Sequence, residues 1–196
     1  MIPEAHHLFS SMTKRQWFYQ LLERLGTHRF AEVGVYRGDF FQVLMQAKGI
    51  QEALAIDCWE LLPDESREML GAREKRVGWD FKSETMKQLR LSFEKTWAHD
   101  PRVHVIHDFS VHAASQIPDG SLDLVYIDGW HDYENVRTDI TAWRPKVRSG
   151  GVISGHDYNP RQGVYKAVNE FIVAEGLQDR FHFFSANSGN WMALLP

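Results

Sequence analysis

The sequence predicts an α/β protein with one mostly parallel sheet and helices on both of its faces. Short apolar runs of strand length alternate with segments in which apolar residues recur at helical spacing. A turn that contains glycine follows the first of these runs, in the stretch RFAEVGVYRG at 29–38. Polar or acidic residues follow four of the runs, and in a parallel sheet such positions meet at one edge. We expect a single domain that spans residues 1–196.

The expected elements follow in chain order. A first helix, capped by Ser11 or Thr13, runs to Leu25 and ends at Gly26. The other expected helices span 39–47, 81–98, 111–116, 133–143 and 163–174. The expected strands span 30–35, 53–56, 103–107, 122–127, 152–154, 181–184 and 191–195, with residues 149–151 as a turn into the fifth strand. Only SANSG joins the last two strands, so we expect them to pair as an antiparallel hairpin.

Composition argues against several classes of partner. The chain carries 22 Lys and Arg against 26 Asp and Glu, and the basic residues are scattered, so we expect no nucleic-acid partner. With Cys58 as the single cysteine, no internal disulfide can form. We find neither a signal peptide nor an apolar run of membrane-spanning length, and expect a cytoplasmic protein without a membrane partner. The segment 59–79 is longer than a simple connection between a strand and a helix needs. It is a candidate lid or substrate-facing insertion, or a plain surface loop.

The first motif joins Glu32, Gly34 and Gly38 with Asp57, the residue that follows the second expected strand. Dinucleotide-binding proteins use G-x-G-x-x-G and seat a pyrophosphate on the following helix. Here one glycine of that pattern is missing and Glu32 precedes the turn, which disfavours a dehydrogenase and suits a cationic ligand. Asp57 is placed to hold two ribose hydroxyls.

Acidic side chains also follow the third, fourth and fifth strands, at Asp108, Asp128 and the pair His156 and Asp157. One such carboxylate is commonly a helix cap, and Asp108 or Ser110 could cap the helix that follows them. Several like charges at one edge are costly unless positive charge lies among them. We therefore expect a cationic cofactor and a divalent metal at this edge.

The stretch at 29–38, followed by AIDCWE, resembles motif I of the class I S-adenosylmethionine-dependent methyltransferases. The resemblance covers nearly the whole chain and implies a Rossmann-like fold with seven strands in the order 3-2-1-4-5-7-6, the seventh antiparallel. The implied cofactor, S-adenosylmethionine, is cationic and carries no phosphate. Asp108 and Phe109 would form the adenine-binding turn. The full set of implied cofactor-binding residues is Glu32, Gly34, Tyr36, Gly38, Asp57, Trp59, Asp108, Phe109 and Asp128.

Two further segments, YIDGWHDYE and GGVISGHDYN, resemble the metal-dependent O-methyltransferases, including the catechol type and the sugar type. The implied metal ligands are Asp128, His156 and Asp157, and the implied metal is Mg²⁺ or Mn²⁺. This family usually has Asp in the place of His156, which leaves open whether His156 binds the metal or supports a ligand. His131 would be the general base and would form the catalytic centre with Asp128.

The resulting hypothesis is a metal-assisted O-methyltransferase that acts on a hydroxyl group of a small molecule, such as a sugar, a natural product or a catechol-like compound. A homodimer is the expected assembly. Two alternatives remain open: a metal-independent methyltransferase that relies on His131, and a hydroxylase or hydrolase on the same fold. A cofactor-binding subunit without catalysis is disfavoured, because the set of Asp128, His131, His156 and Asp157 is intact.

Overall fold

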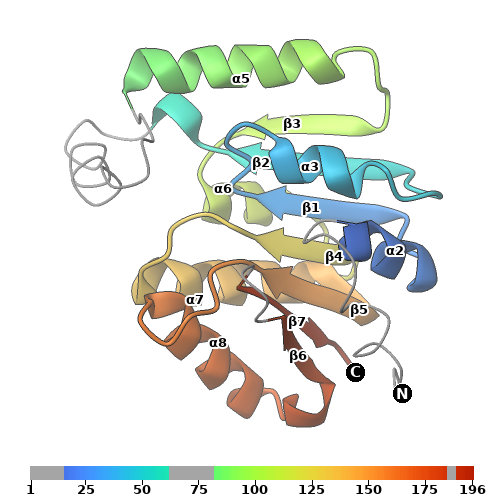
Figure 1. Cartoon of the computed structure of the whole chain (residues 1–196), viewed down its shortest axis with the longest axis vertical. Helices are drawn as coiled ribbons and strands as arrows, with labels where there is room; N and C mark the ends of the chain where they lie inside the picture. Colours follow the sequence, from blue (N-terminus) through green and yellow to red (C-terminus); the bar gives the residue numbers. More distant parts are fainter. Residues whose placement is uncertain (1–15, 62–81, 185–188) are drawn as a thin grey trace.

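A computed structural model describes residues 16–61, 82–184 and 189–196 of the chain (Figure 1). Seven strands form one sheet in the order β3-β2-β1-β4-β5-β7-β6, which confirms the order that the sequence resemblance implied. Strands β1 to β5 pair in parallel, and β7 runs antiparallel to both β5 and β6. The strands are β1 (Arg29–Val33), β2 (Glu52–Asp57), β3 (Val103–His107), β4 (Leu122–Ile127), β5 (Val147–Gly155), β6 (Phe181–Phe184) and β7 (Asn190–Leu194).

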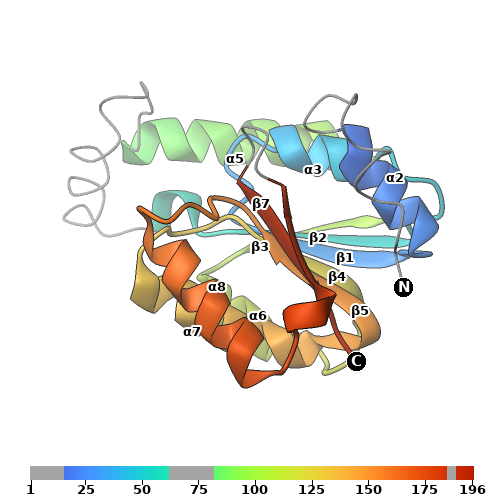
Figure 2. The same cartoon turned by 60° about the horizontal axis from the view of Figure 1, so that its bottom comes forward.

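Helices cover both faces of the sheet (Figure 2). One face carries α2 (Gln16–Arg24), α3 (Asp39–Leu44) and α5 (Ser83–Trp97), and the other carries α6 (Ser110–Ser115), α7 (Tyr133–Trp143) and α8 (Gly163–Ala174). Short 3-10 segments are η1 (Trp59–Leu61), η2 (Arg144–Lys146) and η3 (Gln178–Arg180). Within the described ranges, no helix combines the length and the apolar character needed to cross a membrane.

The expected elements are confirmed, with corrections at several ends. Strand β1 stops at Val33 rather than at residue 35, because Gly34 (φ 89°) and Tyr36 (φ 52°) take left-handed conformations that a strand does not contain. Helix α3 stops at Leu44, before the expected end at residue 47. The caps proposed for the first helix and residues 62–79 of the candidate lid lie outside the described residues.

The largest correction concerns β5. This strand begins at Val147, so the expected turn at 149–151 lies inside it. The pairing of β4 with β5 shifts register between Leu122, opposite Val147, and Leu124, opposite Val152. Glycine in a strand often marks such an irregularity, and Gly150 has a φ of 71°. The glycines at 150 and 151 therefore interrupt the regular backbone as expected, but they form a bulge within β5 instead of a loop before it.

The strands contribute side chains to two apolar cores, one on each face of the sheet. In β1, Ala31 and Val33 belong to the core against α6, α7 and α8, whereas Phe30 belongs to the core against α2, α3 and α5. The alternation follows from the two-residue period of a strand. Because both faces are covered, the ends of the strands are the part of the sheet open to a ligand.

The first and fourth strands meet closely at their carboxyl ends. The Asp128 amide donates a hydrogen bond of 2.7 Å to the Val33 carbonyl, and the Gly34 amide donates one of 2.8 Å to the Ile56 carbonyl. A side chain at position 34 would overlap the backbone carbonyl of Asp128. Glycine at position 34 therefore serves two needs, a positive φ and the space that the Asp128 backbone fills.

We predict that Gly34→Ala lowers the free energy of unfolding by about 3 kcal/mol, because it adds left-handed strain to a steric overlap. Gly120→Ala is the matched control, since Gly120 also has a positive φ of 65° but no neighbour within 4 Å of the added methyl. The control should lose only about 1 kcal/mol. Urea denaturation of both variants measures this, and equal losses would contradict the assigned contact.

Candidate active site

Strained backbone gathers at the carboxyl edge of the sheet. Three non-glycine residues in the described part of the chain have a positive φ: Tyr36 at 52°, Trp59 at 34° and Asp157 at 56°. They follow β1, β2 and β5, which run parallel to their neighbours β4 and β3 and so end at the same edge. Such conformations persist only where surrounding contacts hold them, and they cluster at functional sites.

Asp57, the last residue of β2, links two of these strained turns. Its carboxylate accepts hydrogen bonds from the Tyr36 amide at 2.8 Å and from the Trp59 amide at 2.6 Å. The Trp59 indole N–H donates in turn to the Tyr36 carbonyl at 2.9 Å. Burial raises the pKa of Asp57, although the two amides oppose that shift. The Val35 amide also donates a hydrogen bond to this carboxylate. A carboxylate has about four acceptor positions, so these three amides leave one for a ligand hydroxyl, as the ribose role expected for Asp57 requires.

Trp59, one of the implied cofactor-binding residues, lies in the apolar core. Its side chain is fully buried and packs against Phe93 and His107, with ring centroids 6.0 and 5.9 Å away. The next residue, Glu60, binds Arg90 of α5 through N–O contacts of 2.6 to 3.1 Å. Trp59 and Glu60 thus anchor the segment after β2 to α5, an anchoring that sequence reasoning missed.

Two further residues of the first motif, Glu32 and Gly38, lie in well-defined environments. Glu32 lies in β1 between Ala55 and Tyr126 and is 1% exposed. Gly38 precedes α3 with a φ of 80°, and a methyl there would lie 2.6 Å from the Phe93 ring. Packing against Phe93 is therefore a sufficient reason for glycine at position 38, whether or not a cofactor lies nearby.

The turn after β3 is not a helix cap. Helix α6 begins at Ser110 without a side-chain capping bond, so the proposed capping by Asp108 or Ser110 is wrong. The Asp108 carboxylate accepts from the Phe109 amide at 2.7 Å and from the Gln116 side chain at 3.2 Å. The Phe109 side chain is exposed, and the Ser110 hydroxyl accepts a 2.9 Å hydrogen bond from the indole of Trp143.

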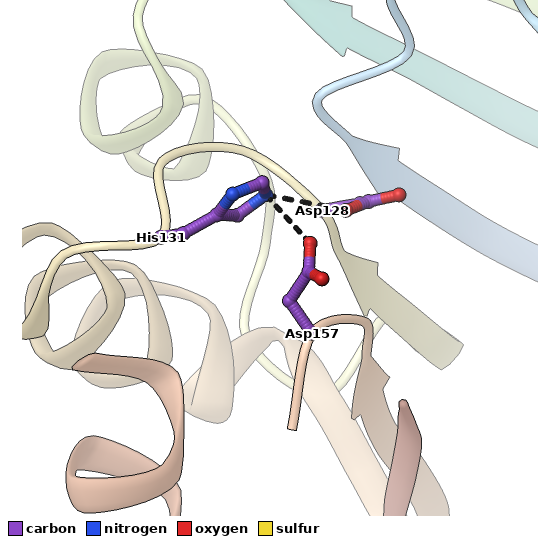
Figure 3. Close-up of side chains that lie close together, drawn as sticks. All are labelled: Asp128, His131 and Asp157. Atoms are coloured by element: carbon purple, nitrogen blue, oxygen red, sulfur yellow. Dashed lines mark ion pairs between the residues drawn. The ribbon is translucent and has the colours of Figure 1, made fainter. Parts of the chain in front are cut away.

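Asp128, His131 and Asp157 converge beyond the ends of β4 and β5 (Figure 3). His131 Nε2 lies 3.0 Å from Asp157 Oδ2 and 3.7 Å from Asp128 Oδ1. One donor atom from each of these three residues lies within 4.8 Å of the others, which is close enough to bind one metal ion. His156 faces the same carboxylates, with its Nδ1 3.2 Å from Asp157 Oδ2 and 3.7 Å from Asp128 Oδ1. Sequence reasoning missed His131 as a candidate ligand.

The local fold explains how these side chains are held. Asp132 caps α7 by accepting from the Asn135 amide at 3.1 Å, so the loop that carries His131 spans only the residues between β4 and this cap. On the other side, the Tyr158 amide donates to the Gly189 carbonyl at 2.8 Å, which ties the segment after Asp157 to β7. Both sides of the cluster are thus fixed to regular elements.

The charges of the cluster are strongly coupled. Burial alone would lower the pKa of His131, but its hydrogen bonds with Asp128 and Asp157 outweigh this and raise it to about 10. The pKa of His156 is also raised, by Asp157 above all, against the opposing effect of burial. For Asp157 the two histidines outweigh burial and lower its pKa, whereas burial raises that of Asp128. The carboxylates thus favour the protonated form of both imidazoles.

Comparison with known proteins identifies the family of the chain. Residues 31–158 match the model of a family described as a methyltransferase domain. An uncharacterized protein of Sinorhizobium fredii and one of Acanthamoeba polyphaga mimivirus are each 24% identical to the chain, over 142 and 147 residues. These matches cover 72% and 74% of the chain, which spans 14% and 59% of the length of these curated relatives.

Solved structures show the same fold. The O-methyltransferase NovP superposes with a TM-score of 0.66 at 17% identity, over 92% of this chain and 77% of NovP. An O-methyltransferase from Bacillus cereus in complex with SAH superposes with a TM-score of 0.56 at 14% identity, over 95% of this chain and 82% of that one. From the family match and the strand order, the chain belongs to the class I S-adenosylmethionine-dependent methyltransferases.

We predict that His131 is protonated at neutral pH in the metal-free protein. Because its pKa in the fold is raised from 6.5 to about 10, its ion pairs contribute stability that is complete below pH 6.5 and is lost as the pH rises through about 10. An NMR titration of the His131 ring, assigned with His131→Gln, measures this pKa. Asp157→Asn should lower it and Asp179→Asn, at an exposed position, should not. An unshifted pKa in the wild-type protein would contradict the geometry.

Proposed function

We propose that this chain is an S-adenosylmethionine-dependent O-methyltransferase that uses a divalent metal and methylates a hydroxyl of a small molecule. One observation carries the proposal. Gly34, in the turn assigned to the cofactor, lies against the backbone of Asp128, which also belongs to the candidate metal cluster. A cofactor at the first site and a metal at the second would therefore lie side by side, as transfer of a methyl group to a metal-bound hydroxyl requires.

The residues of the edge suit this cofactor. S-adenosylmethionine carries positive charge on its amino and sulfonium groups and has no phosphate, so an edge lined by Asp57, Asp108 and Asp128 favours it over a dinucleotide. Asp57 would accept the ribose hydroxyls. The exposed ring of Phe109 would stack on the adenine, next to the Asp108 carboxylate.

The residues present also suit a metal ion. Asp128, Asp157 and His131 would hold it, and this mixture of carboxylate and imidazole suits Mn²⁺ at least as well as Mg²⁺. When bound, such an ion lowers the pKa of an acceptor hydroxyl and orients it. His156, which faces the same carboxylates, would then accept the hydroxyl proton, because its imidazole loses the protonation that those carboxylates favour once their charge is neutralised.

The family resemblance gives the reverse assignment, with His156 on the metal and His131 as the base. We place His131 on the metal because it belongs to the group of three residues that could hold an ion, and because its Nε2 lies 3.0 Å from Asp157 Oδ2, against 3.2 Å for His156 Nδ1; both nitrogens lie 3.7 Å from Asp128 Oδ1. His131→Asn and His156→Asn separate the two assignments. Metal affinity should fall more in the first variant, and the reverse order would support the assignment from the resemblance.

We predict that Asp157→Asn weakens binding of Mn²⁺ at least about 100-fold, because it removes a charged ligand from the centre of the cluster. Electron paramagnetic resonance of free Mn²⁺ in a titration of the full chain measures this directly. Asp179→Asn, which removes an exposed carboxylate elsewhere, should bind Mn²⁺ as the wild type does. If Asp157→Asn also retained wild-type affinity, the metal-assisted mechanism would be wrong and a metal-independent transfer would take its place.

A further inference from the structure

A buried carboxylate on α7 has no evident role in packing. Asp139 is 5% exposed and lies among apolar side chains of the same helix, those of Val136, Ile140 and Trp143. Among the described residues, no lysine, arginine or histidine forms an ion pair with it. Burial raises the pKa of this carboxyl to about 6, opposed by a hydrogen bond from Ser110. Since burial of a carboxylate is costly, an apolar residue would fill this place better if packing were its only task.

The first neighbour of Asp139 is Ser110, at the start of α6. The Ser110 hydroxyl accepts from the Trp143 indole at 2.9 Å and donates to the Asp139 carboxylate. A hydroxyl has one proton to donate, so these two partners fix its direction. Ser110 directly follows Asp108 and Phe109, and its anchoring therefore fixes the turn that these two residues form.

The second neighbour is Gly129, on the other side of the carboxylate. A methyl group built on Gly129 would lie 3.7 Å from Asp139 Oδ2, so this oxygen faces the backbone that follows Asp128. Asp139 is thus hydrogen-bonded to the turn after β3 and faces the residue next to the proposed metal ligand.

We propose that Asp139 is a positioning residue that holds the adenine turn at Asp108–Ser110 in place relative to Asp128, so that cofactor affinity depends on a carboxylate outside the cofactor site. The inference rests on the function proposed above for that turn. Because Asp139 acts on the cofactor site through its hydrogen bond with Ser110, its effect on cofactor affinity can be separated from its effect on the stability of the fold.

The test is calorimetry of S-adenosylhomocysteine binding to the full chain. Asp139→Ala and Ser110→Ala should each weaken binding about tenfold, and the double variant should be no weaker than the weaker single one, because both remove one contact. Asp139→Asn keeps an acceptor for the Ser110 hydroxyl and should bind within about threefold of the wild type. Independent losses that multiply in the double variant, or an Asn variant as weak as the Ala variant, would overturn the proposal.

Two controls keep the outcomes distinct. Val136→Ala opens a cavity on the same face of α7 and should lower the melting temperature without changing the affinity. Asp108→Ala and Phe109→Ala test the turn itself. If these two leave the affinity unchanged, the assignment of the adenine turn fails; if they weaken binding while Ser110→Ala and Asp139→Ala do not, only the role of Asp139 fails. Should Asp139→Ala not fold, Ser110→Ala and Asp139→Asn still decide the question.

Discussion

The close approach of the first strand to the fourth is the constraint on which the site depends. Gly34 ends β1 in a left-handed conformation, and the Asp128 backbone occupies the space that a side chain would need. This contact turns the chain away from the sheet early enough for Tyr36 to reach the Asp57 carboxylate. It also fixes where Asp128 leaves β4. The positions of the turn that contacts Asp57, the residue proposed to bind the ribose, and of the candidate metal cluster therefore depend on the same contact.

Electrostatics gives the same edge its chemical character. Carboxylates placed close together favour bound cations or protonation, and here two imidazoles lie within reach of Asp128 and Asp157. In the protein without ligands, these acids favour protonated histidines, whose charge balances theirs. The proposed reaction would replace that balance with a metal ion and a sulfonium, and would free an imidazole to accept a proton. In this proposal, the metal ion and the sulfonium replace the imidazole protons as the positive charges that face the carboxylates.

Much of this could be predicted from sequence, because the fold depends on local patterns. Short runs rich in apolar and aromatic residues predict β3, β4 and β6 with correct bounds, and helical spacing does so for α7 and α8. The error at the start of β5 has a physical cause, since the glycines at 150 and 151 form a bulge inside the strand. The burial of Trp59 was not predicted; it follows from a turn that folds back on Tyr36. Contacts between distant segments, such as His131 with Asp157 or Asp139 with Ser110, depend on tertiary structure that no spacing encodes. The roles of the cofactor-binding and metal-binding residues stay predictions.

Whether cofactor and metal bind next to each other can be measured by paramagnetic relaxation. The measurement is the effect of bound Mn²⁺ on the proton resonances of S-adenosylhomocysteine in exchange with the full chain. The account predicts strong broadening, greatest for the methylene groups beside the sulfur and weaker for the adenine protons, and its loss in Asp157→Asn. Binding of S-adenosylhomocysteine without broadening, at Mn²⁺ concentrations that saturate the protein, would show that metal and cofactor bind apart and would contradict the account.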